Sequence, residues 1–231
     1  MISSRVAAVR ERIARAAARA GRSPGDVTLI AVSKTQPAEA VREAFAAGLR
    51  HFGENKVQEA EGKIAALVDL AAGGLRWHMI GHLQANKSRR AAELFDAVDS
   101  VDGAALALRL ERGAEEAGKV LPVHVQVDLG QEETKFGLAE ADLFPTLEQL
   151  RAGKSLRVEG LMVLPPYADD PEAARPFFRR LRELLEEARG RGLVAGHGLS
   201  MGMSHDFEVA VEEGATQVRV GTALFGERKR T

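Results

Sequence analysis

Short apolar, β-prone runs alternate along the chain with longer stretches whose apolar residues recur at helical spacing. The predicted strands are VTLIAVS (27–33), LRHFG (49–53), WHMIG (77–81), AVDSVD (97–102), VHVQVDLG (123–130), VEGLMVL (158–164), HGLSMGM (197–203) and QVRVGTALFG (217–226). Helices are predicted over 37–47, 55–71, 83–94, 103–117, 139–150, 171–189 and 205–213. Such regular alternation predicts a parallel sheet covered by helices.

About eight strand–helix units in a chain of 231 residues match the size of a closed (β/α)₈ barrel. We therefore predict an α/β fold with a single domain over 1–231, a TIM-type barrel with an extra N-terminal helix. An open doubly wound sheet is the alternative that the same alternation allows. The sequence has no internal repeat, and no Pro/Gly/Ser linker long enough to separate two domains.

The N-terminal segment 1–26 is rich in Arg and Ala. Val6, Val9, Ile13 and Ala16 recur at helical spacing, and Gly21 is a typical helix stop. This pattern predicts an amphipathic helix that covers the bottom of the barrel or flanks it. A mitochondrial transit peptide is the alternative, because the segment up to Gly21 contains only one acidic residue.

Composition narrows the classes of function. The chain has 32 basic and 33 acidic residues, a net charge of −1, which does not favour nucleic acid as a partner. It has no cysteine, so disulfides and thiolate metal sites are excluded, and a reducing cytoplasm fits. No apolar run approaches the roughly 18 residues of a membrane span. The six histidines are scattered without the spacing of a metal site.

Function in such a barrel is expected at the C-terminal ends of the strands. The predicted strands end at Lys34, Asn55, His82, Asp102, Asp128, Pro165, 200–204 and 219–222. One lysine, one arginine, several amides and a Gly/Ser/Thr cluster would therefore meet at one mouth.

The Gly/Ser/Thr cluster lies in GLSMGMSHD (198–206) and RVGTALFG (219–226). Barrel phosphate sites are commonly built from the loops after strands seven and eight, where glycines allow close approach and backbone N–H groups point at an anion. Ser204, Gly221 and Thr222 are the candidate phosphate ligands. In the alternative interpretation Ser204 only caps a helix and the glycines only form turns.

Lys34 follows an apolar strand, beside this cluster. An amine there would hold a phosphate as a point charge, or attack an aldehyde once desolvation keeps it neutral. The two features together suggest a phosphorylated aldehyde, for which pyridoxal 5′-phosphate is the obvious candidate. The alternative is an exposed loop lysine.

Gly198, Ser200 and Gly202 also match the G-x-S-x-G motif of hydrolases. That motif needs an acid and then a histidine downstream, but His205 precedes Asp206. We therefore interpret this match as chance.

Several motifs, in order, resemble the family of pyridoxal phosphate homeostasis proteins. They are AVSKTQP (31–37), HFGENKVQEA (51–60), WHMIGHLQANKSR (77–89), GLMVL (160–164) and LSMGMSHDFEVAVEEGATQVRVGTALFG (199–226). The resemblance implies one barrel like the N-terminal domain of alanine racemase. It implies a non-catalytic carrier that buffers and delivers pyridoxal phosphate for vitamin B6 and amino-acid homeostasis, with apo-enzymes as possible recipients.

The resemblance also implies residue roles. Lys34 would carry the cofactor as a Schiff base, with Asn55 near the ring and Arg219 against the pyridine nitrogen. The phosphate would be held by Ser204, Gly221 and Thr222, together with Ser200 and the backbone of Met203.

An amino-acid racemase on the same barrel is the alternative function. Racemisation needs a second base, and the tyrosine-bearing β domain of alanine racemase is expected to be absent, because the sequence reaches Thr231 shortly after the last strand. Tyr167 and His82 are the remaining candidates for this second base.

Delivery of the cofactor needs an amine that takes it over from Lys34, and Lys135 and Lys229 are the candidate acceptor amines. We expect a monomer.

Overall fold

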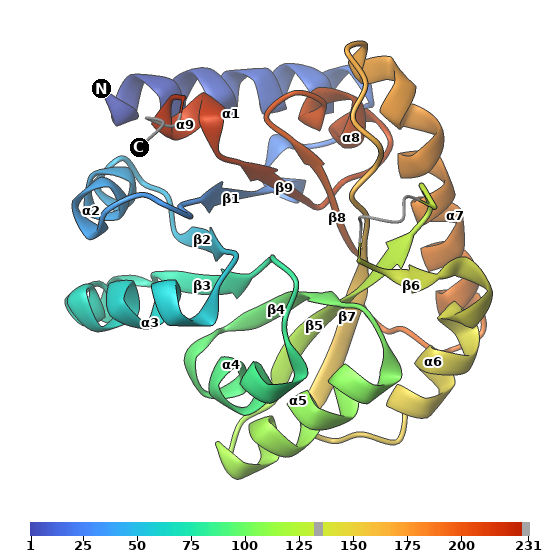
Figure 1. Cartoon of the computed structure of the whole chain (residues 1–231). Coiled ribbons are helices and arrows are strands. Elements are labelled where there is room, and N and C mark those ends of the chain that lie inside the picture. Colours follow the sequence, from blue (N-terminus) through green and yellow to red (C-terminus); the bar gives the residue numbers. More distant parts are fainter. Residues whose placement is uncertain (132–135, 228–231) are drawn as a thin grey trace.

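Eight parallel strands form a closed ring in the computed structural model, which describes residues 1–131 and 136–227 (Figure 1). They are β1 (Thr28–Val32), β2 (His51–Glu54), β3 (Arg76–Met79), β4 (Ala97–Val101), β5 (Leu121–Asp128), β7 (Leu156–Met162), β8 (Gly198–Met203) and β9 (Gln217–Val220). Two-residue β6 (Leu138–Ala139) pairs with the end of β5.

The ring closes where the first strand meets the last. In the parallel pairing of β1 with β9, Ile30 lies opposite Arg219 and Ala31 opposite Val220. On the other side β4 pairs with β5, with Val98 opposite Val123. The predicted (β/α)₈ barrel is therefore confirmed, and the open doubly wound sheet is excluded.

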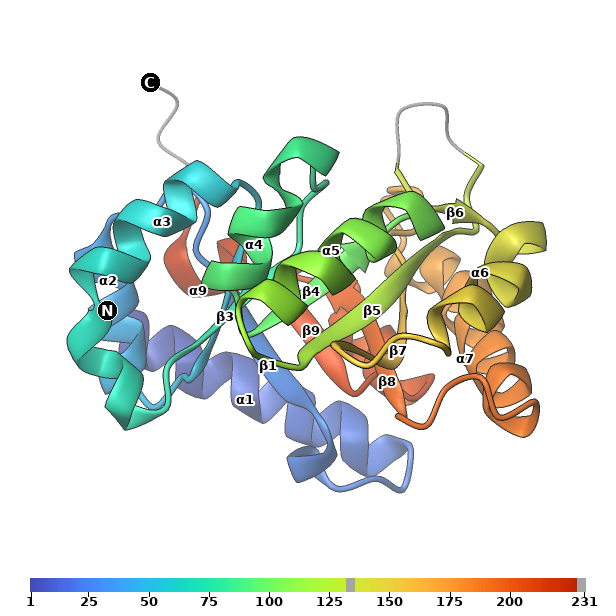
Figure 2. The same cartoon turned by 90° about the horizontal axis from the view of Figure 1, so that it is seen from below.

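Helices surround the ring, as Figure 2 shows for α4 and α5 in front of the strands. The α-helices are α1 (Ile2–Arg19), α2 (Ala38–Ala46), α3 (Val57–Ala66), α4 (Ser88–Leu94), α5 (Ala104–Glu116), α6 (Leu143–Leu150), α7 (Arg175–Gly190), α8 (Phe207–Glu212) and α9 (Thr222–Phe225). Short 3₁₀ turns cover Pro24–Asp26, Val68–Gly73, Ala85–Lys87, Glu140–Asp142 and Pro171–Ala174. Within the described ranges, none of these helices combines the length and apolar character that crossing a membrane requires.

The N-terminal helix α1 flanks the barrel and packs against α8 and α9 (Figure 1). Its buried stripe contains Val6, Val9, Ile13 and Ala16, the apolar positions of the predicted amphipathic helix. An ion pair between Arg12 and Glu208, 2.7 Å long, joins α1 to α8 at the edge of this contact. The segment is therefore part of the packed fold.

The bounds of several predicted elements differ from the structure, and two of these differences have a local cause. The predicted strand 217–226 ends at Val220, and α9 begins at Thr222, because the Ser204 hydroxyl accepts hydrogen bonds from the N–H groups of Gly221 and Ala223 and turns the chain. The predicted helix 55–71 ends at Ala66, since Leu67 leaves helical geometry at φ −122°, ψ 19°.

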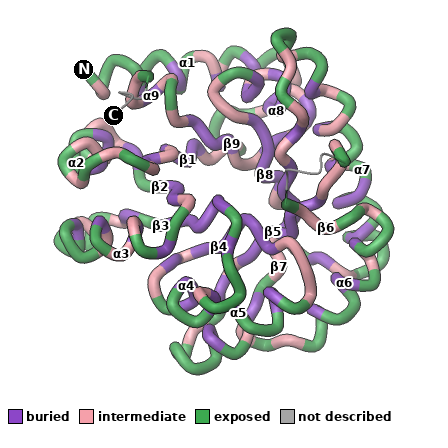
Figure 3. The backbone as a smooth tube through the Cα atoms, viewed as in Figure 1, coloured by how far each residue is buried: buried purple, intermediate pink, exposed green. Residues whose placement is uncertain are grey.

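Buried residues follow the strands and the inward faces of the helices, as Figure 3 shows. The barrel interior also holds a polar chain. The rings of His51 and His78 are joined by a 2.9 Å N–N hydrogen bond, and Asp99 joins His78 at 3.1 Å and His124 at 2.9 Å. Burial tends to raise the pKa of Asp99, but the two histidines outweigh it and hold that pKa below its usual range.

Candidate functional site

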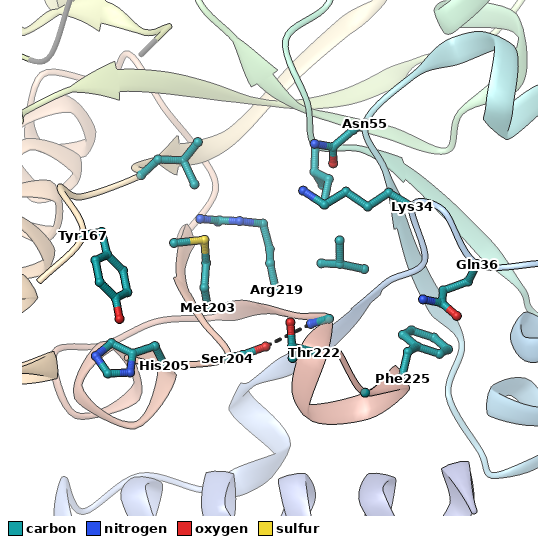
Figure 4. A pocket seen from close by; sticks show the side chains of 15 residues that line it. Lys34, Gln36, Asn55, Tyr167, Met203, Ser204, His205, Arg219, Thr222 and Phe225 are labelled. Atoms are coloured by element: carbon teal, nitrogen blue, oxygen red, sulfur yellow. Dashed lines mark hydrogen bonds between the residues drawn. The ribbon is translucent and has the colours of Figure 1, made fainter. Parts of the chain in front are cut away.

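A cavity of about 350 Å³ opens at the C-terminal ends of the strands (Figure 4). We call it the mouth cavity. Its walls include Lys34 after β1, Asn55 after β2, Met203 and Ser204 at the end of β8, and Arg219, Gly221 and Thr222 from β9 and the turn that follows. The residues that share this cavity come from both ends of the chain and meet because β1 pairs with β9.

Lys34 lies in the turn between β1 and α2, and its side chain lines the mouth cavity (Figure 4). It is half-buried, whereas its neighbour Ser33 is fully buried. The next residue, Thr35, has φ +64°, in the left-handed region that a β-branched residue rarely adopts. A strained turn thus presents the lysine to the cavity.

A buried charged cluster supports this turn. The ammonium of Lys63 on α3 donates to the Ser33 carbonyl at 2.7 Å, to Glu54 at 2.8 Å and to Glu59 at 2.7 Å. The Ser33 hydroxyl also donates to Glu54, at 2.6 Å, and the N–H of Thr35 donates to Glu59, at 2.5 Å. We call Lys63, Glu54 and Glu59 the turn-support cluster.

The environment shifts the pKa of both carboxylates of the turn-support cluster. Burial raises the pKa of Glu54, against the opposing effect of its hydrogen bonds from Lys63 and Ser33. Burial would also raise the pKa of Glu59, but the bonds from Lys63 and from the backbone of Thr35 outweigh it and lower that pKa. Sequence reasoning missed this cluster. The Glu59–Lys63 spacing of four on a helix was the available signal, and it usually marks a solvated pair.

Ser204 connects the loop after β8 with the turn after β9, on the other side of the mouth cavity. Its hydroxyl accepts from the N–H of Gly221 at 3.2 Å and from that of Ala223 at 3.5 Å. The N–H of Met203 donates to the carboxylate of Asp206 at 2.6 Å. The backbone N–H groups of Gly221, Ala223 and Met203 thus have acceptors within the protein, while the Ser204 hydroxyl keeps its own proton to donate. Together with the Thr222 hydroxyl on the same cavity wall, it is a donor suited to an anionic ester.

Arg219 forms part of the cavity wall and is only 3% exposed. Its guanidinium donates to the Ser200 hydroxyl at 2.7 Å and to the Val163 carbonyl at 2.9 Å. Burial lowers the pKa of Arg219 to about 10, while Asp99 and Asp206 oppose the shift. The side chain is therefore a fixed cationic donor at neutral pH.

Asn55 lies on the wall of the cavity close to Lys34 (Figure 4). Its backbone passes next to Gly81, where an added Cβ would lie 2.6 Å from the Asn55 carbonyl oxygen and 2.7 Å from its Cα. Only glycine at position 81 leaves Asn55 in this place.

Tyr167 and His205 stand at the edge of the cavity, with ring centroids 5.5 Å apart. Tyr167 is 75% exposed, as expected for a loop tyrosine. His82 lies outside the cavity wall, stacked on Phe136 and 3.0 Å from the Asp102 carboxylate. The candidate acceptors Lys135 and Lys229 lie outside the described residues.

Seven predicted cofactor residues line the one cavity: Lys34, Asn55, Met203, Ser204, Arg219, Gly221 and Thr222. The eighth, Ser200, is buried, and its hydroxyl is bonded to Arg219. That burial also argues against Ser200 as the exposed nucleophile of a hydrolase. Among the residues that the structure describes, no group of three or more metal-ligating side chains is arranged to hold a metal ion.

A sequence profile described as the alanine racemase N-terminal domain matches residues 5–229. The chain is 49% identical to the pyridoxal phosphate homeostasis protein of Pseudomonas aeruginosa over 227 residues, covering 98% of this chain and 96% of that protein. It is 46% identical to the protein of the same name from Aquifex aeolicus over 225 residues, covering 97% of each. The chain therefore belongs to the pyridoxal phosphate homeostasis proteins, a family with the fold of the alanine racemase N-terminal domain.

Solved structures support the same family and the same fold. PipY of Synechococcus elongatus, solved with PLP bound, has 44% identity and a TM-score of 0.86, covering 98% of this chain and 100% of that one. The alanine racemase of Corynebacterium glutamicum shares the fold, with a TM-score of 0.69 at 21% identity. This chain covers 61% of that enzyme, and the match covers 96% of this chain.

Proposed function

We propose that this protein binds pyridoxal 5′-phosphate in the mouth cavity, as a Schiff base with Lys34, and buffers and delivers the cofactor without catalytic turnover. The observation that carries the proposal is the meeting of Lys34 with Ser204, Gly221 and Thr222 in one cavity of about 350 Å³. The binding of PLP by PipY, a structure with 44% identity, supports the choice of cofactor.

The donor set fits this cofactor. Ser204 and Thr222, with the backbone around Gly221, would hold the phosphate ester, while Asn55 would lie beside the ring. The bound cofactor would supply an aldehyde carbon, to which the Lys34 nitrogen bonds as one water leaves. Ser200 would then act indirectly, by orienting Arg219, since its hydroxyl already accepts a hydrogen bond from that guanidinium.

Arg219 would restrain carbanion chemistry on the cofactor. A guanidinium is always a donor and cannot give or take the ring proton at neutral pH. Placed against the pyridine nitrogen, it leaves that nitrogen unprotonated and so weakens the ring as an electron sink. The lack of a suitable second base is what favours a carrier over a racemase, because His82 lies outside the cavity wall and Tyr167 is mostly exposed.

Borohydride reduction followed by peptide mass mapping tests the proposal. Reduction should fix one pyridoxyl group on Lys34 in the wild-type protein and none in Lys34→Ala, while Lys119→Ala should retain the label. Lys119 is a suitable control because it bonds the Phe95 carbonyl near the N-terminal ends of β4 and β5, at the opposite end of the barrel from the mouth cavity. A label that persists in Lys34→Ala would contradict the proposal.

A racemase assay separates the two functions. The loaded protein is incubated with single enantiomers of alanine, serine and glutamate, and the opposite enantiomer is measured by chiral chromatography. We expect no sustained conversion. Turnover that disappears in Lys34→Ala would favour the racemase.

Delivery is tested with the apo-form of a PLP enzyme as recipient. Activity should return to the apo-enzyme when loaded protein is added. The rate of reactivation should exceed the rate expected if the cofactor were first released into solution. Repeating the assay with an excess of a scavenger of free PLP shows how much of the reactivation passes through released cofactor. Comparison with Lys135→Ala and Lys229→Ala then tests both predicted acceptor amines.

A further inference from the structure

We propose that Lys63 is a positioning residue for Lys34: with Glu54 and Glu59 it holds the turn 33–35 in its strained conformation and so fixes where the reactive amine lies. This inference rests on the proposed function, because it concerns the lysine that would bond the cofactor. It assigns a role to a buried charged cluster outside the cavity wall.

The first argument is where the hydrogen bonds fall. Lys63 bonds the carbonyl of Ser33, the residue before Lys34, at 2.7 Å. Glu59 accepts from the N–H of Thr35, the residue after it, at 2.5 Å. Since Lys63 also bonds Glu59 at 2.7 Å, one ammonium ties together the backbone on both sides of Lys34.

The second argument is the division of roles between two lysines. Lys63 is 8% exposed, and its three N–H donors match three acceptors, on Ser33, Glu54 and Glu59, all within 2.8 Å. With its three donors engaged inside the cluster and its side chain outside the cavity wall, Lys63 is not placed to attack a carbonyl of a ligand in the cavity. Lys34 lines the cavity instead, so position and reactivity belong to different side chains.

The third argument is the conformation of Thr35. Its φ of +64° is unfavourable for a β-branched residue, so the surrounding structure must impose it. The described contacts around it are the bond from its N–H to Glu59, the burial of Ser33, and a bond from the Gln36 N–H to the Ser33 carbonyl at 3.0 Å that closes the turn. The same carbonyl accepts from Lys63. Without Lys63, Glu59 would lose its partner and the turn would relax toward ordinary backbone angles.

The test begins with cofactor-free protein. In Lys63→Met the backbone amide of Thr35 should exchange with solvent about tenfold faster or more, because its acceptor Glu59 is no longer held. The same substitution at Lys119, which bonds the Phe95 carbonyl elsewhere, should leave that amide unchanged. Glu59→Ala serves as a second variant should Lys63→Met fold poorly, since Glu59 is partly exposed.

The second measurement is the rate of Schiff-base formation after mixing with PLP, followed by absorbance. Lys63→Met should slow it by about tenfold, because the amine is no longer held in the reactive geometry. Adding Thr35→Asn should restore much of the rate, since asparagine tolerates the left-handed region and needs less support. A merely structural loss would not be rescued by that change.

The outcomes are distinct. Unchanged Thr35 exchange in both Lys63→Met and Glu59→Ala would overturn the inference, and so would slow Schiff-base formation with no rescue by Thr35→Asn. Faster exchange with rescue supports it. A borohydride label on a residue other than Lys34 would overturn the proposed function instead, while the exchange of the Thr35 amide would still decide whether Lys63 holds the turn.

Discussion

The guanidinium of Arg219 donates to the hydroxyl of Ser200 at 2.7 Å, inside the barrel wall. A second bond, to the Val163 carbonyl at 2.9 Å, fixes the same group from the end of β7. The orientation of Arg219 is therefore set by two neighbouring strands and is independent of any phosphate ligand.

Replacing Ser200 with alanine should weaken the binding of PLP and of unphosphorylated pyridoxal by a similar factor. Loss of one hydrogen bond to a charged group is worth about 1.5 kcal/mol, or about tenfold in affinity. Fluorescence titration of both ligands measures this. A loss confined to the phosphorylated ligand would show that Ser200 acts on the phosphate.

Ser204→Ala should have the opposite selectivity. It removes the hydroxyl that organises the N–H groups of Gly221 and Ala223, so PLP affinity should fall by about tenfold or more while pyridoxal affinity changes little. Ser88→Ala is the control, because that hydroxyl bonds the Ala85 carbonyl on the neighbouring turn. Equal losses for both ligands would place Ser204 outside the phosphate site.

Gly81→Ala should displace Asn55. The new methyl group would lie 2.6 Å from the Asn55 carbonyl oxygen, so the backbone at position 55 must move. We expect about tenfold weaker PLP binding and a loss of about 1–3 kcal/mol in unfolding free energy. Gly62→Ala in α3 meets no atom within 4 Å and should instead stabilise by about 0.5–1 kcal/mol. Urea denaturation of both variants provides the comparison.

The stability of the fold should fall as pH drops from about 6.5 to about 4. Burial, and then the charge of His78, lowers the pKa of His51 to about 4, with Asp99 and Asp96 opposing this and Arg76 adding to it. Within that window the unfolded chain binds a proton at His51 that the folded chain does not. Stability is then lost with decreasing pH.

His51→Gln should remove this dependence. At pH 5 the wild-type protein should lose about 1–2 kcal/mol of unfolding free energy through His51, relative to pH 7.5, and the variant should lose correspondingly less. His197→Gln, at an exposed position, should retain the wild-type slope. Identical slopes in wild-type protein and His51→Gln, measured by urea denaturation at a series of pH values, would contradict the prediction.

The barrel and most of the mouth cavity could be predicted because they depend on local patterns. Each strand is a short apolar run, and parallel strands bring their C-terminal residues to one mouth, so Lys34 and Arg219 were placed together from their positions alone. The chain after Val220 was predicted wrongly as strand. Its turn depends on the hydroxyl of Ser204, seventeen residues before Gly221, which no local pattern reports.

The turn-support cluster could not be predicted for a similar reason. Lys63 and Glu59 have the spacing of an ordinary surface pair, and Glu54 is one residue at the end of a strand. They become a buried unit only when α3 packs beside the turn after β1, which brings Ser33 and Thr35 within reach. The hydrogen bond between Ser200 and Arg219 could likewise not be predicted, because the two residues lie on different strands.

The pairing of β1 with β9 has a consequence for biosynthesis. Lys34 leaves the ribosome well before Ser204, Arg219 and Thr222, which lie about 170–190 residues later in the sequence. Until β9 docks beside β1, a nascent chain carries the amine but lacks the opposite wall. Loading with cofactor would therefore have to wait until β9 has been translated and paired with β1, so that a bound cofactor would indicate a closed barrel.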